Sequence, residues 1–404
     1  MRRLVLVTLL AVPACTPAHP SPPSPRLPGW PAATAFLDSA VAAGAAPGAV
    51  LGVSLAGEHR YFGTGRLGLD DPARPDSATV YDLASLTKVI GLTTMVMLAV
   101  DESRLDVDAP VGRYVPAFAA ASSQPERRDV TLRHLLTHSS GLPAWRPLYQ
   151  ETATRSEALA LADSTRLVAA PGEKYTYSDL GAIILTQAVE RTLGHRIDTL
   201  LEQQVFGPLG MTDTRYLPPD DWRARIAPTE NDPWRGRVLR GEVHDENAAR
   251  LDGVSGHAGL FSSARDLLRF ADVLLTWWAD KADKAENCRQ LPALPALPAL
   301  SALSALSALK KFARRQNLPP GSSRALGWDT STPGGSGGSR LSPGSFGHTG
   351  FTGTSIWIDP ERCLAIVLLS NRVHPTRDND RWGPVRGQVA DRVVEGLPID
   401  TLTH

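Results

Sequence analysis

The sequence predicts an α/β fold, an α+β sandwich in which an antiparallel sheet is built from both ends of the chain and a helical lobe is inserted between them. Runs rich in apolar and β-branched residues lie near both ends, at 49–63 and 353–369. The chain between them carries apolar residues at helical spacing. Its 404 residues suffice for a large core or two lobes.

The predicted elements follow in chain order. Turn residues separate the two strands at each end, and the helices have apolar positions three or four residues apart. The elements are a hairpin over 49–63, helices over 85–100, 182–192 and 262–277, strands over 353–358 and 363–369 joined by Asp359-Pro360-Glu361-Arg362, and a helix over 385–394.

The composition excludes several classes of protein. Lys plus Arg and Asp plus Glu number 42 each, so the formal charge is zero, which argues against nucleic acid as the main partner. With 42% hydrophobic and 21% charged residues, the chain has the profile of a folded protein. Three cysteines cannot form a disulfide scaffold, and Cys288 and Cys363 are expected to be free thiols.

The first 15 residues have the pattern of a secretion signal. Arg2 and Arg3 precede an apolar run over 4–12 that is too short to span a bilayer. The run closes on Val12-Pro13-Ala14-Cys15, which resembles a bacterial lipobox with an unusual proline. We therefore expect export to the bacterial cell envelope, with a lipid on Cys15 as the one membrane contact, or alternatively a plain cleavable signal.

Two low-complexity segments flank or interrupt the expected body at 31–404. Residues 16–30 are Pro-rich and predict a stiff extended linker. An insertion near 279–311 contains Leu-Pro-Ala and then Leu-Ser-Ala triplets over 291–309. A period of three matches neither helix nor strand, so a surface arm is expected there.

Ser85-Leu86-Thr87-Lys88 opens the first apolar helix and is the first candidate for chemistry. Positions three apart share a helix face, and a helix N-terminus favours a developing alkoxide on Ser85. A desolvated Lys88 would lose affinity for its proton and could act as a base. The alternative is an N-cap serine beside a solvated lysine.

Two further segments carry candidate residues. In Tyr177-Ser178-Asp179, before the second helix, the phenol could relay a proton, or the segment could be a capping turn. His348-Thr349-Gly350 enters the first C-terminal strand, where a substrate could lie along the strand edge, or it could be an ordinary turn. The backbone N–H groups of Phe351 and Ser85 could then form a pair of oxyanion donors.

Taken together, these three segments resemble the motifs of the penicillin-recognising serine hydrolases. The resemblance is closest to the branch of class C β-lactamases, D-alanyl-D-alanine peptidases and esterases. It covers about 31–397 and extends to the flanking segments Tyr81–Lys88, Leu132–Pro143 and Gly256–Ser262. It implies an α/β sandwich with the site in a cleft between the sheet and the helical lobe.

The resemblance also implies roles. Ser85 would be the acylated nucleophile, Lys88 its proton acceptor and Tyr177 the shuttle to the leaving group, while His348, Thr349 and Gly350 would line the cleft with Asp179. The expected function is therefore a serine hydrolase that forms an acyl-enzyme on an ester or amide of a small molecule or peptide, without cofactor or metal. The alternatives are a true β-lactamase or D-alanyl-D-alanine carboxypeptidase, and a catalytically silent binding protein.

Two departures from the family pattern favour an esterase or peptidase over a β-lactamase. The second motif ordinarily ends in asparagine, whereas an ionised Asp179 accepts hydrogen bonds only and could pair with Lys88, which would raise the pKa of that lysine. The third motif often begins with lysine, whereas His348 is expected to be neutral near pH 7.

Other polar residues are expected to be structural. His134 and His138 are four apart but lack a third ligand, so no metal site is predicted. Glu242-Val243-His244-Asp245 is expected to be a solvated loop.

Overall fold

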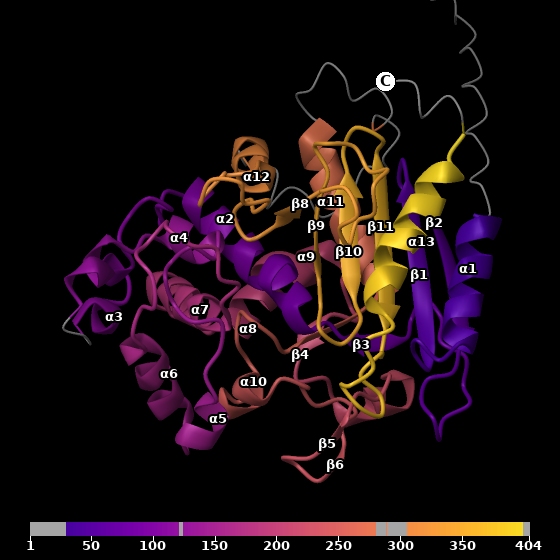
Figure 1. Ribbon diagram of the computed structural model, residues 1–404, viewed down its shortest axis with the longest axis horizontal. Helices are drawn as coiled ribbons and strands as arrows, with labels where there is room; N and C mark the ends of the chain where they lie inside the picture. The colour runs from indigo at the N-terminus through magenta and orange to yellow at the C-terminus, as the bar shows by residue number, and fades with distance from the viewer. Residues whose placement is uncertain (1–29, 121–123, 280–287, 289–304, 399–404) are drawn as a thin grey trace, which may run out of the picture.

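The computed structural model describes residues 30–120, 124–279, 288 and 305–398, and its centre is a six-stranded sheet in the order β2-β1-β11-β10-β9-β8 (Figure 1). Every neighbouring pair in this sheet is antiparallel. Its strands are β1 (Gly48–Leu55), β2 (Glu58–Gly65), β8 (Asp329–Thr330), β9 (Phe346–Thr349), β10 (Ser355–Asp359) and β11 (Leu364–Ser370).

The sheet joins the two ends of the chain. Strand β1 pairs with β11 in a register that sets Ala49 opposite Ser370 and Leu55 opposite Leu364. Both strands are buried along their whole length, as expected of central strands covered on both faces. The predicted antiparallel sheet built from both termini is therefore confirmed.

Helices cover both faces of the sheet. On one face, α1 (Pro31–Ala42) and α13 (Gly383–Glu395) pack together, and α11 (Ala264–Ala279) covers the other face (Figure 1). Trp30, at the end of the predicted linker, belongs to the first of these layers: it is 3% exposed and its Nε1 donates to the Val393 carbonyl at 2.9 Å.

The inserted lobe lies to one side of the sheet and is mostly helical. The predicted first helix is a 3-10 turn (Ala84–Leu86), a π-helical turn (Lys88–Thr93) and then α2 (Thr94–Asp101). It is apolar and long enough to cross a membrane, but 83% of it is buried inside the protein. The other helices after it are α3 (Pro116–Ala120), α4 (Leu132–Leu136), α5 (Leu148–Glu151), α6 (Arg155–Ser164), α7 (Asp179–Leu193), α8 (Ile197–Leu201), α9 (Gly207–Leu209), α10 (Glu246–Arg250) and α12 (Ala305–Ala313).

Two small sheets lie where the lobe meets the large sheet. One has the order β3-β7-β4 and carries the chain into the first candidate segment; the other is a hairpin. Their strands are β3 (Val80–Asp82), β4 (Arg215–Tyr216), β7 (Leu260–Ser263), β5 (Asn231–Asp232) and β6 (Arg237–Val238).

The structure corrects the expected surface arm at its last residues, 305–309, and the expected free thiols at Cys288 and Cys363. The end of the triplet segment is helix α12, whose Leu309 and Phe312 are fully buried, because serine replaces proline there and permits a helix. Cys288 and Cys363 form a disulfide that ties the insertion to the start of β11. The predicted signal, the possible lipid site at Cys15, the linker up to residue 29 and most of 280–304 lie outside the described residues.

Candidate active site

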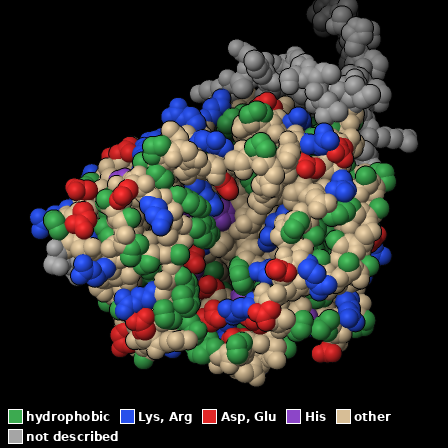
Figure 2. All heavy atoms as spheres, viewed as in Figure 1, with side chains coloured by type: hydrophobic (Ala, Val, Ile, Leu, Met, Phe, Trp, Pro, Cys, Tyr) green, Lys and Arg blue, Asp and Glu red, His purple; other side chains and the backbone are tan. Residues whose placement is uncertain are grey.

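A cavity of about 650 Å³ opens between the sheet and the helical lobe, and the hollow is visible in Figure 2. All the candidate residues but Lys88 line it, and Lys88 lies directly beneath Ser85. The lining includes Ser85, Tyr177, Asp179, His348, Thr349, Gly350 and Phe351. The structure thus brings together side chains from three distant segments of the chain.

Ser85 lies on a tightly held turn. Buried Asp82 accepts hydrogen bonds from the Ala84 N–H at 2.8 Å and the His244 N–H at 2.7 Å, and Ala84 has a φ of 46°. Burial raises the pKa of Asp82, while the two N–H donors oppose that rise. The β9–β10 turn presses against the same turn, because a Cβ on Gly350 would lie 2.3 Å from the Leu83 carbonyl oxygen.

Lys88 has three oxygen atoms close to its ammonium group. Its Nζ donates to Ser85 Oγ at 2.9 Å and to the His257 carbonyl at 3.0 Å, and it lies 2.7 Å from Asp179 Oδ1. Ser85 Oγ and the His257 carbonyl accept two of its three hydrogens, and Asp179 is its ion-pair partner. Burial alone would lower the pKa of Lys88, but the neighbouring Asp179 and Tyr177 outweigh it and raise the pKa above its ordinary value.

The expectation of a proton-poor lysine is therefore wrong, and the alternative pairing with Asp179 is present. The ion pair forms because Asp179 opens α7, whose preceding residue Ser178 caps the helix by accepting the Gly181 N–H. This arrangement directs Oδ1 of Asp179 to Lys88, while the residue also lines the cavity. Lys88 can stabilise negative charge on Ser85, but in this state it has no lone pair to accept a proton.

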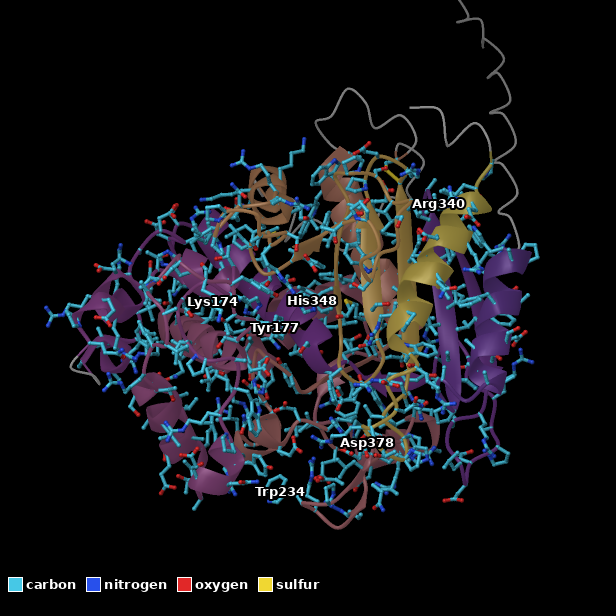
Figure 3. The ribbon with its side chains drawn as sticks, viewed as in Figure 1. Lys174, Tyr177, Trp234, Arg340, His348 and Asp378 are labelled. Carbon is cyan, nitrogen blue, oxygen red and sulfur yellow. A yellow bond between two sulfur atoms is a disulfide. The ribbon has the colours of Figure 1, made fainter. Side chains whose placement is uncertain are left out.

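Tyr177 lies between cations and imidazoles. The ring centroid is 5.0 Å from Lys88 Nζ and 5.3 Å from the Arg324 guanidinium carbon. It is also 5.9 Å from the ring of His348, and Figure 3 shows Tyr177 and His348 beside each other. Its hydroxyl has no hydrogen-bond partner among the residues described. The Tyr177 hydroxyl is therefore a buried polar group without a partner, on a residue that lines the cavity.

His348 is a neutral acceptor. Its Nδ1 donates to the Thr349 carbonyl at 2.8 Å, which leaves a lone pair on Nε2, and Nε2 has no partner within the described chain. Burial, with the charges of Arg324 and Lys88, holds the pKa of His348 well below its ordinary value. This agrees with the neutral imidazole expected from the sequence.

Phe351 offers both a backbone donor and an exposed ring. Its N–H donates no hydrogen bond to any residue described, so it is available to an oxyanion. Its ring is 48% exposed and lies between the Arg372 guanidinium, at 4.4 Å, and the stacked ring of His244, at 5.8 Å.

Sequence reasoning missed four residues around this cavity. His138, considered above for metal binding, has a φ of 55°, accepts the Ser178 N–H at 3.1 Å and packs 4.4 Å from the Tyr177 ring. His257, which is buried beneath the site, donates from Nε2 to Asp245 Oδ1 at 2.8 Å. Burial would raise the pKa of Asp245, but the contact with His257 outweighs burial, so the pKa is lowered. Arg324 is the fourth.

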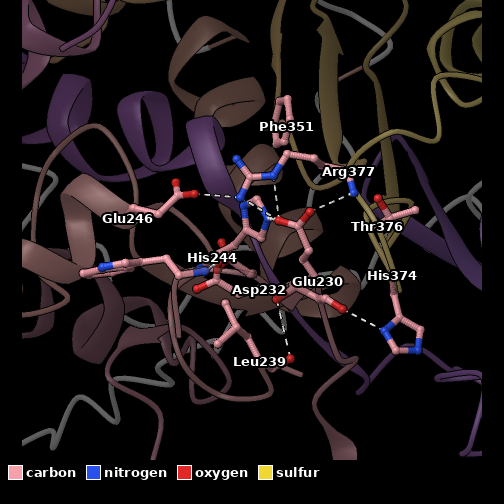
Figure 4. Close-up of polar contacts among 12 residues, drawn as sticks. Glu230, Asp232, Leu239, His244, Glu246, Phe351, His374, Thr376 and Arg377 are labelled. Carbon is pink, nitrogen blue, oxygen red and sulfur yellow. Dashed lines mark hydrogen bonds and ion pairs between the residues drawn. The ribbon is translucent and has the colours of Figure 1, made fainter. Parts of the chain in front are cut away.

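The segment Glu242–Asp245 is therefore not the solvated loop that was expected. Glu230 accepts from His244 at 2.9 Å and pairs with Arg377 at 2.6 Å, and Arg377 also pairs with Glu246 at 2.7 Å (Figure 4). These paired charges keep His244 at 4% exposure. The one available signal was the density of charged and histidine residues in this segment, which does not by itself distinguish a cleft from a surface.

Comparison with known proteins agrees with this geometry. A family model described as Beta-lactamase matches residues 33–391. A protein of Escherichia coli (strain K12), whose name assigns it provisionally as a D-alanyl-D-alanine carboxypeptidase, is 31% identical over 335 residues, which is 76% of this chain and 72% of that protein.

Solved structures show the same fold. A class C beta lactamase from Rhodobacter sphaeroides has a TM-score of 0.67 at 22% identity, covering 90% of this chain and 98% of that one. EstCE1, a hydrolase with promiscuous acyltransferase activity, has a TM-score of 0.67 at 20% identity, covering 90% and 97%. The chain belongs to the beta-lactamase family of serine hydrolases.

Proposed function

We propose that this protein is a serine hydrolase that acts through an acyl-enzyme on Ser85, with an ester or amide as substrate. The observation that carries the proposal is the hydrogen bond of 2.9 Å from Lys88 Nζ to Ser85 Oγ, beside the unpartnered Tyr177 hydroxyl. Acyl transfer to serine requires a nucleophile, a cation that stabilises its alkoxide and a group that carries the proton.

The proposed reaction has two halves. In the first, Ser85 Oγ forms a bond to the substrate carbonyl carbon, its proton passes through Tyr177 to the leaving group, and the bond to that group breaks. The N–H groups of Ser85 and Phe351 stabilise the oxyanion. In the second, the water oxygen forms a bond to the acyl carbon, the water proton passes through Tyr177 to Ser85 Oγ, and the bond between Ser85 Oγ and the acyl carbon breaks.

The contacts around Lys88 change one role inferred from the resemblance. Since the ammonium is paired with Asp179 and donates to Ser85 Oγ and the His257 carbonyl, it serves as an electrostatic stabiliser of Ser85, and the proton passes through Tyr177 instead. Asp179 accepts hydrogen bonds only, so it cannot donate to a substrate carbonyl. With the neutral His348, this favours esters and less acidic amides over β-lactams.

A second candidate is the removal of a terminal residue from a peptide with a free carboxylate. Arg372 and Arg386 both line the cavity, and the hydrogen bonds that they donate within the described chain go to backbone carbonyls. Guanidinium groups without a carboxylate partner suit a carboxylate ligand. The relative named for D-alanyl-D-alanine carboxypeptidase activity supports the same reading.

Two measurements test the proposal. A fluorescent phosphonate should label the wild-type protein and fail to label Ser85→Ala, whereas equal labelling, or none of either, would favour the silent binding protein. Next, kcat/KM should be compared for short p-nitrophenyl esters, D-alanyl peptides and nitrocefin. A value for nitrocefin far above that for the esters would contradict the proposed preference.

For location, we propose export to the bacterial cell envelope with the lipid on Cys15 as a tether. The disulfide between Cys288 and Cys363 supports export, because disulfides persist in oxidising compartments. With those two paired, Cys15 is the remaining cysteine of the three and is available for a lipid.

A further inference from the structure

Arg324 places a guanidinium among aromatic rings at the edge of the cavity. Its Nε donates to the Tyr175 hydroxyl at 3.1 Å, and its Cζ is 5.5 Å from the Tyr175 ring centroid and 5.3 Å from that of Tyr177. The side chain is 12% exposed and lines the cavity. It comes from the segment between α12 and β8, which no motif discussed above includes.

The charge of Arg324 is poorly neutralised. Among the residues described, the carboxylate within 4 Å of it is Asp329, at 3.8 Å from Nη2, and Nη1 has no partner. Burying a guanidinium without a close carboxylate is unfavourable, and contacts with ring faces offset part of that cost. A cation kept in such a place exerts its field on the groups around it.

The neighbouring groups respond to this field. Beyond the effect of burial, Arg324 is the largest charge that lowers the pKa of His138 and of His348, the two imidazoles that flank Tyr177. Lys88 also lies near Tyr177, but Asp179 at 2.7 Å offsets its charge. Of the two cations at the Tyr177 ring, Arg324 is therefore the less compensated one.

We propose that Arg324 is a positioning residue for the proton relay: its guanidinium stabilises the negative charge that develops on the Tyr177 oxygen while that phenol carries a proton from Ser85 to the leaving group. The inference rests on the proposed function. Since His348 is neutral, the cation on this side of the relay is supplied by the α12–β8 segment rather than by the strand β9.

This role predicts a specific kinetic effect. Arg324 contacts the aromatic rings rather than the reacting atoms, so it should affect the proton-transfer steps and not the binding of a neutral substrate. Arg324→Gln should lower kcat for an uncharged p-nitrophenyl ester by about 100-fold, the size found when one preorganised charge donor is lost, and leave KM within about twofold.

The experiment uses four variants of the purified protein with that ester. Arg324→Lys should retain most of the activity, because it keeps the charge. The double variant Arg324→Gln/His348→Lys should recover at least about tenfold over Arg324→Gln, because a lysine at 348 returns a cation to the Tyr177 ring from the other side. Arg113→Gln is the matched control, since this exposed arginine lies 5.6 Å from the Tyr114 ring, away from the cavity; its kcat should be unchanged.

The outcomes separate the inference from the function on which it rests. An unchanged kcat in Arg324→Gln, a rise in KM without loss of kcat, or equal losses in the Lys and Gln variants would overturn the inference. So would failure of the double variant to recover while its thermal unfolding midpoint matches that of wild type. If Ser85→Ala keeps the esterase activity, the proposed function fails, whatever Arg324 does.

Discussion

At the residue scale, the ion pair between Lys88 and Asp179 determines what the cavity can do. It keeps Lys88 as a cation and engages one oxygen of Asp179, a residue that lines the cavity. A single carboxylate in place of an amide therefore changes both the pKa of Lys88 and the hydrogen bonds offered to a ligand.

Asp179→Asn should shift the preference toward β-lactams. Removing the carboxylate removes the largest contribution that raises the pKa of Lys88, and the new amide can donate to a substrate carbonyl. We expect the ratio of kcat/KM for nitrocefin to that for a p-nitrophenyl ester to rise by about tenfold, as one added polar contact would give. Asp378→Asn, on the exposed segment after β11, is the control; an Asp179→Asn ratio equal to that of the control would contradict this account.

At the element scale, the β9–β10 turn contacts the residues that lead into the turn carrying Ser85. Thr352 and Thr354 donate to the carbonyls of Asp82 and Leu83 at 2.7 and 3.0 Å. Because these bonds join the sheet to the first turn of the lobe, a shift of either element displaces Ser85 relative to the Phe351 N–H.

Gly350→Ala should therefore impair catalysis more than folding. The added Cβ would lie 2.1 Å from Thr354 Oγ1 and 2.3 Å from the Leu83 carbonyl, so the turn must move. A displacement near 1 Å can cost about 100-fold in rate, and we expect kcat/KM for the ester to fall by that order. In Gly181→Ala the new Cβ has ordinary contacts, the nearest at 3.6 Å; a similar loss in that variant would show that the effect is not specific to this turn.

The paired charges at the floor of the cavity give a second prediction at this scale. Burial would raise the pKa of Glu230, but the hydrogen bonds from His244 and Arg377 outweigh burial and lower this pKa from its ordinary value to about 2. A lowered pKa contributes stability above the unfolded value, near 4.5, and loses it as pH falls toward 2. Wild type should therefore have a higher unfolding midpoint than Glu230→Gln at pH 6, and the difference should shrink between pH 4.5 and 2. A constant difference across that range would contradict the pairing.

The sequence predicts elements better than it predicts the contacts between them. Strands 49–63 and 353–369 follow from local composition, and so does the helix before residue 193. The pairing of Lys88 with Asp179 was open in the sequence, because it depends on how α7 is capped. His138 and Arg324 could not be predicted, since a positive φ and an aromatic enclosure arise from tertiary packing.

At the scale of the whole molecule, the disulfide constrains a long loop. Cys288 and Cys363 are 75 residues apart in the sequence, and their disulfide joins the insertion to β11. This pairing could not be inferred from the low-complexity sequence around Cys288. Closing a loop of this length restricts the unfolded chain.

Removing the disulfide should lower stability without abolishing activity. For Cys288→Ser/Cys363→Ser we expect a loss of about 4 kcal/mol in the free energy of unfolding, the upper value for such a loop. The midpoint of thermal unfolding should fall, and a reductant should lower that of wild type but leave that of the double variant unchanged. Equal midpoints for the two proteins without reductant would contradict a stabilising disulfide.

The proposed lipid on Cys15 would determine where the whole molecule resides. A lipid on Cys15, followed by the Pro-rich segment, would hold the folded body away from a membrane, since proline at that density favours an extended chain. Cys15→Ser, expressed in a bacterial host, should move the protein from the membrane fraction to the soluble fraction, while esterase activity per molecule stays the same. Cys288→Ser/Cys363→Ser should remain with the membrane. If Cys15→Ser partitions like wild type, the protein is not tethered through this cysteine.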